Sequence, residues 1–226
     1  MRPQRRPSWR QSGQGTIEFQ IMSVLVLIPL LLGVLQMGLL VVAKNTLNVA
    51  TLGAARAGAA SGGSHAAMND ALALGLAALH VAKVKQATGV GMTDISAGNY
   101  TQVAVGAIGA SKVDNLVYTK IRVINPVRAS FEDFGIDKAG DKLIPVTKVY
   151  DNMKVGAKSG QTHADALLLK IEVRYCAELV VPFISQIILG FNRDPACLSV
   201  GTPRIPMVSQ ALVRMTVPPS RNTLLK

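Results

Sequence analysis

The sequence predicts an α+β protein whose long N-terminal helix can cross a membrane and then enters a head of packed helices and a small antiparallel sheet. An uncharged apolar run covers residues 21–43, and a proline-free, alanine-rich stretch follows it. Three later apolar stretches, bounded by turn residues, favour strands. We expect a basic leader (1–13), a membrane helix with its stalk (14–62) and an α+β domain (63–226).

The composition argues against disorder and against nucleic-acid binding. Hydrophobic residues make up 49% of the chain and charged residues only 16%, so there is ample apolar surface to bury. The net charge is +11, but no basic run follows residue 10 and aromatic residues amount to 4%. Because both a basic patch and a stacking platform are missing from the sequence, we expect no nucleic-acid partner.

The apolar run from Ile21 to Ala43 is long enough to span a bilayer as a helix, with Ser23 and Gln36 as its only clearly polar members. A lone Lys44 follows the run, and a cluster of arginines precedes it: Arg2, Arg5, Arg6 and Arg10. This asymmetry places the N-terminus in the cytoplasm and residues 45–226 outside the inner membrane.

A cleaved secretory signal is the alternative, with cleavage after Ala43. The apolar core of a signal peptide is normally about 7 to 15 residues long, and this run is clearly longer. The helical pattern also continues beyond Ala43 rather than starting a new domain. We therefore expect a retained anchor.

The stalk KNTLNVATLGAARAGAASGG (44–63) places small or apolar residues on one helical face, at Leu47, Ala50, Ala54 and Gly58. Such a stripe lets another helix approach closely, although a merely alanine-rich stalk is the alternative. The rod from 14 to 61 would be about 70 Å long at 1.5 Å per residue. Pro29 lies inside it and is expected to bend it.

Glu18, a carboxylate, lies just before the apolar run that can span lipid, and Gly13 lies five positions before Glu18. A basic leader, a glycine and an apolar helix with this glutamate together resemble the processing site of type IV prepilins. The resemblance implies that prepilin peptidase cuts between Gly13 and Gln14. Glu18 would then pair with the new N-terminal amine of a neighbouring subunit and fix the axial register. The alternative is a glutamate that reaches water at the headgroups.

The segment GTIEFQIMSVLVLIPLLLGVLQMGLL and the later ATLGAARAGAA resemble the TadE-like proteins of tight-adherence (Tad/Flp) pilus systems. The matching residues are Gly13, Glu18, Phe19, Pro29, Ala54, Ala55, Arg56, Gly58 and Ala59. Looser similarity extends to INPVRASFEDFG (124–135) and IEVRYCAELVVPFI (171–184), while Gln14 departs from the apolar residue common at the first mature position.

The resemblance implies a minor pseudopilin with a pilin-like fold, held in the bacterial inner membrane by a single pass, with a periplasmic domain. Such a protein assists pilus assembly for surface adhesion and biofilm formation. Its partners would be other pilins or pseudopilins and the prepilin peptidase. The related TadG-like proteins often carry a metal-binding domain, but the nearest stretch here, DISAG (94–98), has Gly98 where that loop needs a serine. We therefore expect no metal site.

In the head, Ser64 can cap a helix over 66–84 whose buried face carries Met68, Leu72, Leu76 and Leu79. A Gly/Ala/Ser-rich passage then leads to a strand over 116–124, with Val117, Thr119, Ile121 and Val123 on one side, closed by Asn125-Pro126.

Residues 127–164 are expected to form a long loop or small excursion. Further strands are expected at 166–180 and 208–217. Between them lies a short apolar helix (182–191), which we expect in the core; the alternative is a position on the membrane face.

Two cysteines, Cys176 and Cys197, flank the short apolar helix. Outside the cytoplasm a disulfide is permitted, and it would stabilise the fold by about 3 kcal/mol by closing the loop between them. Two buried free thiols are the alternative. We predict the disulfide.

Residues typical of catalysis are sparse. His65, His80 and His163 are scattered, and neither a nucleophile elbow nor a phosphate-binding glycine loop occurs in the sequence. Asp133 and Asp137 are expected to be solvated loop acids. We expect no enzyme, no cofactor and no small-molecule substrate; the alternative is an anchored periplasmic binding module or hydrolase unrelated to pili.

Overall fold

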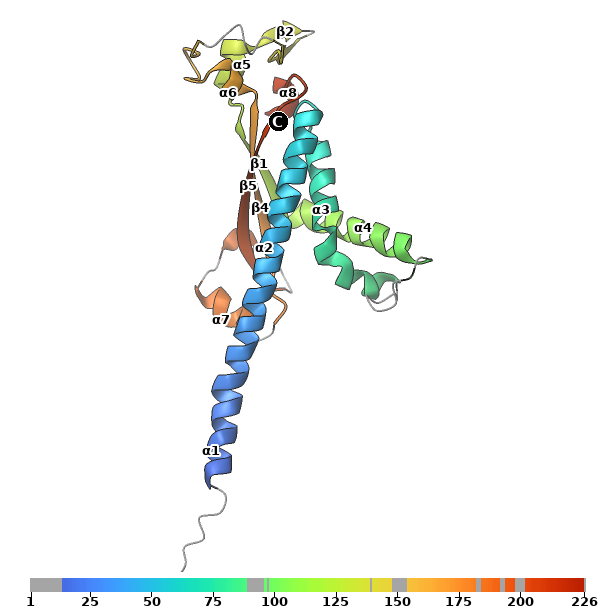
Figure 1. Cartoon of the computed structure of the whole chain (residues 1–226), viewed down its shortest axis with the longest axis vertical. Coiled ribbons are helices and arrows are strands. Elements are labelled where there is room, and N and C mark those ends of the chain that lie inside the picture. Colours follow the sequence, from blue (N-terminus) through green and yellow to red (C-terminus); the bar gives the residue numbers. More distant parts are fainter. Residues whose placement is uncertain are drawn as a thin grey trace, which may run out of the picture.

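The computed structural model describes residues 14–88, 96, 98–138, 140–147, 154–181, 184–191, 194–197 and 202–225. It confirms the predicted α+β class: a long apolar helix rises into a head that holds a small antiparallel sheet and several helices (Figure 1). The predicted leader, including Gly13, lies outside the described residues.

The rod covers the range predicted from the sequence. It consists of α1 (Gln14–Met22), a π-helical turn (η1, Ser23–Leu27) and α2 (Ile28–Ala60). Gly62 and Gly63 end the rod with positive φ angles of 66° and 93°, which glycine adopts without steric cost. The amide of Gly63 donates to the carbonyl of Gly58 at 2.8 Å, as in a Schellman termination.

Pro29 explains the π-helical turn. Proline has no amide hydrogen, and its ring collides with the carbonyl four residues earlier, so a regular helix cannot pass through it unchanged. Just before Pro29, the amide of Ile28 donates to the carbonyl of Ser23, five residues back. The helix therefore accommodates Pro29 by widening for one turn, and helical structure continues on both sides.

The next two helices pack against each other: α3 (His65–Thr88) lies beside the upper rod, and α4 (Tyr100–Tyr118) extends sideways away from it (Figure 1). Ser64 caps α3 as predicted, because its hydroxyl accepts the amide of Ala67 at 3.4 Å. Met68, Leu72 and Leu76 form the predicted buried face.

The helix α4 corrects the sequence analysis. The expected strand over 116–124 begins only at Thr119, and the part of the Gly/Ala/Ser-rich passage from Tyr100 onward is helical, so Val117 lies in a helix. The buried face of α4 is made of small or polar residues such as Ala107, Ser111 and Asp114. Such a face gives little hydrophobic periodicity, which is why the sequence pattern did not indicate a helix.

The main sheet has the order β1-β4-β5, with both pairs antiparallel: β1 (Thr119–Asn125), β4 (Leu168–Glu178) and β5 (Arg204–Arg214). In β4, Leu169, Ile171 and Val173 are buried, while the alternating residues between them are partly exposed. This buried face joins the core formed by α2 and α3.

The described residues of 127–164 (127–138, 140–147 and 154–164) form a small excursion at the end of the head farthest from α1 (Figure 1). It contains α5 (Arg128–Phe134), a two-stranded hairpin of β2 (Ile136–Lys138) and β3 (Asp141–Leu143), and the start of α6 (His163–Ala166). The described elements also include α7 (Ile184–Phe191), a 3₁₀ turn (η3, Pro195–Cys197) and α8 (Arg221–Leu224).

The close approach of α2 and α3 yields a prediction. A Cβ added at Gly75 would lie 2.6 Å from the Cβ of Ala50, so Gly75→Ala should force the two helices apart and destabilise the head by about 1–3 kcal/mol. The measurement is urea unfolding of the full chain in detergent, followed by circular dichroism. Gly109→Ala on α4 is the matched control, because nothing lies within 4 Å of its added Cβ. Equal stability of the two variants would contradict this packing.

Candidate membrane anchor and assembly site

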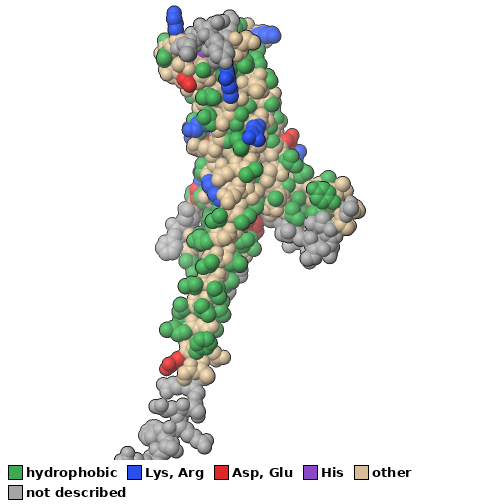
Figure 2. Space-filling view, in the orientation of Figure 1, with side chains coloured by type: hydrophobic (Ala, Val, Ile, Leu, Met, Phe, Trp, Pro, Cys, Tyr) green, Lys and Arg blue, Asp and Glu red, His purple; other side chains and the backbone are tan. Residues whose placement is uncertain are grey.

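The lower rod exposes an apolar surface that suits lipid. Phe19 is 72% exposed, and further apolar side chains on all sides of the rod are also exposed: Ile21, Leu25, Leu30, Val34, Met37 and Val41. We call this apolar surface of the lower rod the sleeve, and Figure 2 shows hydrophobic side chains along its visible face, below the head. The rod is long and apolar enough to cross a membrane, and a surface of this size would be unfavourable in water. It fits single-pass membrane anchoring.

Glu18 lies in the second turn of α1, within this sleeve, and its side chain is exposed. In the part of the chain that the structure describes, no basic side chain pairs with it. Gln14 begins α1, so a cut after Gly13 would put the new amine at the first residue of the helix. An unpaired carboxylate near hydrocarbon is unfavourable, and the usual solution is a cationic partner.

Gln36 has a partner that the sequence did not reveal. It interrupts the apolar run, yet it is 0% exposed, and its Oε1 accepts the amide of Val181 at 2.9 Å. Val181 belongs to the segment between β4 and α7, and α7 packs against α2. A polar residue in the middle of the run therefore attaches part of the head to the membrane helix.

The predicted small-residue stripe is used within the subunit. Ala50, Ala54 and Gly58 are buried between α2 and the rest of the head. A Cβ at Gly58 would lie 2.8 Å from the Sδ of Met68 on α3 and 3.0 Å from Leu169 on β4. The helix that approaches this stripe is thus α3 of the same chain.

The predicted disulfide is present between Cys176 and Cys197, whose Cα atoms are 5.5 Å apart. Cys176 lies on β4 and Cys197 in the 3₁₀ turn, so the bond closes the loop that carries α7. Both residues are buried.

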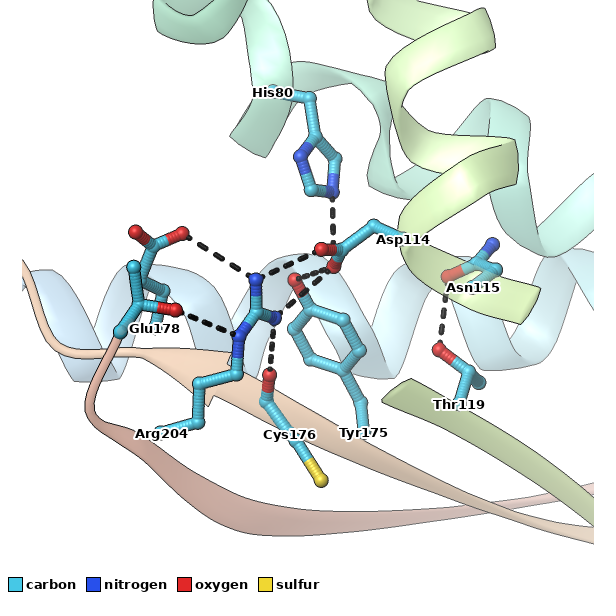
Figure 3. Close-up of polar contacts among 9 residues, drawn as sticks. His80, Asp114, Asn115, Thr119, Tyr175, Cys176, Glu178 and Arg204 are labelled. Atoms are coloured by element: carbon cyan, nitrogen blue, oxygen red, sulfur yellow. Dashed lines mark hydrogen bonds and ion pairs between the residues drawn. The ribbon is translucent and has the colours of Figure 1, made fainter. Parts of the chain in front are cut away.

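A buried ionic cluster attaches α4 to the sheet (Figure 3). The carboxylate of Asp114 accepts two hydrogen bonds from the Arg204 guanidinium, at 2.9 and 3.3 Å, and one from the Tyr175 hydroxyl at 3.1 Å. His80 on α3 places its Nε2 3.6 Å from Asp114, and Glu178 lies 3.6 Å from Arg204. We call these five residues the Asp114 cluster.

The surroundings of the Asp114 cluster favour a structural role. Burial, together with the Asp114 carboxylate, raises the pKa of Tyr175, so its phenol stays neutral and donates its proton to Asp114. Arg204 also donates to the carbonyl of Cys176 at 3.0 Å and lies 3.7 Å from the centre of the Tyr118 ring. Asp114, Arg204 and His80 are all buried, so the cluster joins elements rather than facing a ligand.

The other histidines and acids singled out from the sequence lie apart. His163 packs edge-on to Phe134, with ring centres 5.3 Å apart, and burial lowers its pKa. His65 approaches the carbonyl of Leu224. Asp137 lies on exposed β2.

Asp133 stabilises a turn of the excursion. It accepts the amide of Lys158, and both the amide and the hydroxyl of Ser159, the latter two at 2.7 Å. The Ser159 hydroxyl and amide hold the pKa of Asp133 below its usual value. The interpretation of Asp133 as a merely solvated acid misses this role. Among the described residues, no group of three or more His, Cys, Asp or Glu side chains is arranged to hold a metal ion.

The fold is that of an α+β protein with a long N-terminal apolar helix that fits single-pass membrane anchoring. Residues 13–56 match the family described as TadE-like protein, which confirms the resemblance of the N-terminal segment and indicates involvement in a Tad pilus system. Neither the curated proteins nor the solved structures give a match to the chain. The looser similarity at 124–135 and 171–184 stays a prediction.

The Asp114 cluster yields a second prediction. Asp114→Ala removes the nearer carboxylate and leaves the buried Arg204 with Glu178, at 3.6 Å, as the remaining carboxylate of the Asp114 cluster, so the head should lose about 3–5 kcal/mol of stability. Urea unfolding of the full chain in detergent measures the loss. Asp70→Asn is the control, because the Asp70–Lys112 pair also joins α3 to α4 but is exposed, and exposed pairs contribute little. If both variants unfold at the same urea concentration, the Asp114 cluster does not stabilise the head as we expect.

Proposed function

We propose that this chain is a minor pseudopilin of a tight-adherence pilus system, held in the bacterial inner membrane, where it assists assembly of the pilus for adhesion and biofilm formation. One observation supports this most strongly. A carboxylate, Glu18, is exposed in the second turn of an apolar membrane helix, within the segment that matches the TadE-like family. A membrane tether alone has no need of a charge at that place.

The proposed partner of Glu18 is the N-terminal amine of a neighbouring subunit. Prepilin peptidase would create this amine by cutting between Gly13 and Gln14. Gln14 precedes Glu18 by four residues, or about 6 Å along the axis at 1.5 Å per residue. A neighbour displaced by about one helical turn would therefore bring its amine level with Glu18. Pairing in a low dielectric would fix this axial register and compensate both charges.

The surface available to neighbouring subunits is the lower rod. Above Leu47, α3 and the sheet cover the small-residue face of α2. Below Gln36, the apolar side chains of α1 and α2, including Phe19, are exposed and can pack against other pilin helices. We therefore place the assembly contact on residues 14–35, and assign Ala50, Ala54 and Gly58 to packing within the subunit.

The arginine-rich leader (1–13) would stay in the cytoplasm until it is removed, with 14–62 as membrane helix and stalk and 63–226 as the periplasmic domain. The bond between Cys176 and Cys197 supports this orientation, because disulfides persist in oxidising compartments such as the periplasm.

The proposed cleavage is tested by the intact mass of the protein made with and without its prepilin peptidase. We expect the peptidase to remove residues 1–13, because the glycine, the basic leader and the apolar helix form its recognition pattern. Gly13→Leu, which places a bulky side chain at the cut, should keep the full mass. A mature protein that retains residues 1–13 would contradict the proposal, and loss of residues 1–43 would indicate a secreted domain.

The register role is tested with Glu18→Ala. This variant should insert into the membrane normally, but its recovery in complexes with other pilins should fall about ten-fold, which corresponds to about 1.4 kcal/mol. Insertion is measured by resistance to carbonate extraction, and assembly by co-purification. Gln20→Ala, an exposed polar residue on the same helix, is the control and should assemble normally. Normal assembly of Glu18→Ala would exclude the register role.

A further inference from the structure

A second apolar surface lies on the segment that the disulfide closes. From Leu179 to Asn192 the sequence contains no charged residue. Val180 is 70% exposed, and Ile187 on α7 is 55% exposed. The same helix directs Ile184 and Ser185 inward, where both are buried. The sequence-based expectation of a core helix therefore holds for one side of α7 only. Among the described residues of α7, the exposed side carries Ile187 together with Gln186 and Gly190.

The position of this segment relative to the membrane helix is fixed by Gln36. The hydrogen bond from the Val181 amide to Gln36 places the segment directly against α2, and α7 lies beside the rod below the sheet (Figure 1). Gln36 is 18 residues above Glu18, which corresponds to about 27 Å of helix. The hydrocarbon core of a bilayer is about 30 Å thick. With Glu18 at the inner boundary, Gln36 and α7 lie at the outer boundary.

Lys44 gives a second estimate of the depth of α7 in the bilayer, counted from the outer end of the apolar run. It follows the apolar run, and its ammonium donates to the carbonyl of Val208 at the lower part of β5. Lysine favours the headgroup region, where its charge reaches water and anionic phosphates. Gln36 lies about 12 Å below Lys44 along the helix, which again places α7 where headgroups meet acyl chains.

We propose that α7 and the residues before it insert into the outer surface of the lipid bilayer, as a second membrane contact beside the spanning helix. Ile187 and Val180 would enter the boundary region, while Ile184 and Ser185 face the protein. Backbone groups at this depth must find partners inside the protein, and the Gln36 side chain supplies one for the Val181 amide. The lipid-facing side of α7 continues the apolar surface of α2, which is why lipid is the proposed occupant.

The test places a single tryptophan on α7 of the full chain in lipid vesicles. Trp9, the only tryptophan of the sequence, is first replaced by phenylalanine. Ile187→Trp is then compared with Val155→Trp, a position of similar exposure (64%) in the excursion at the opposite end of the head. The vesicles contain phosphatidylcholine brominated in the upper part of its acyl chains, which quenches tryptophan on contact. We expect blue-shifted emission and several-fold stronger quenching at position 187 than at position 155.

Two results would overturn the inference. Emission at position 187 that matches position 155 would show that α7 lies in water. Blue-shifted emission without quenching would show that protein, such as a second copy of the chain, covers this surface instead of lipid. Position 187 is exposed, so the substitution does not disturb the core, and the intact disulfide verifies the fold. The inference depends on the membrane anchor alone and stands if Glu18→Ala assembles normally.

Discussion

The packing of the upper half of α2 is the contact on which the rest of the head depends. Leu47, Ala54 and Ala55 of this helix are buried, and α3 and the sheet both pack against it. Small residues make this possible, because Gly75 of α3 approaches Ala50 so closely that a Cβ would collide. One continuous helix therefore meets two different surroundings. Its lower half exposes large apolar side chains, which suits lipid, and its upper half carries small and apolar residues because it is part of the core of the head.

The attachment of α4 to the sheet depends on charge more than on apolar packing. α4 has few large buried side chains, and it is joined to the sheet through Asp114, Arg204 and Tyr175. Buried ion pairs stabilise a fold only when their hydrogen bonds are well satisfied, and here the carboxylate accepts three. The arrangement orients α4, which packs against α3, relative to the sheet. It lies well away from α1, so the stability of the head and the chemistry of the anchor can be altered independently.

The elements with a strong local pattern could be predicted from the sequence: the rod, α3, β4 and β5. The sequence could not indicate α4, because its buried face of small and polar residues carries no apolar period. It could not indicate the partners of Gln36 or Asp114 either, since Val181 and Arg204 lie far away along the chain and meet them only after folding. The role of Glu18 stays a prediction, and its signal in the sequence is local: a charge, a glycine and an apolar run within a few turns. Cys176 and Cys197 were identifiable because no other cysteine competes for them.

Pro29 affects how α1 is rotated relative to α2, because the π-helical turn that accommodates it lies between them. Glu18 and Gln36 are 18 residues apart, so an unbroken α-helix would place them on the same side after about five turns. The π-helical turn at Ser23–Leu27 lies between them and accommodates about one extra residue, which rotates α1 relative to α2 by about 100°. Gln36 is held against the segment before α7, so the side of α2 that faces the head is fixed. The π-helical turn therefore helps to set the angle between the side of the rod that carries Glu18 and the side that holds the head.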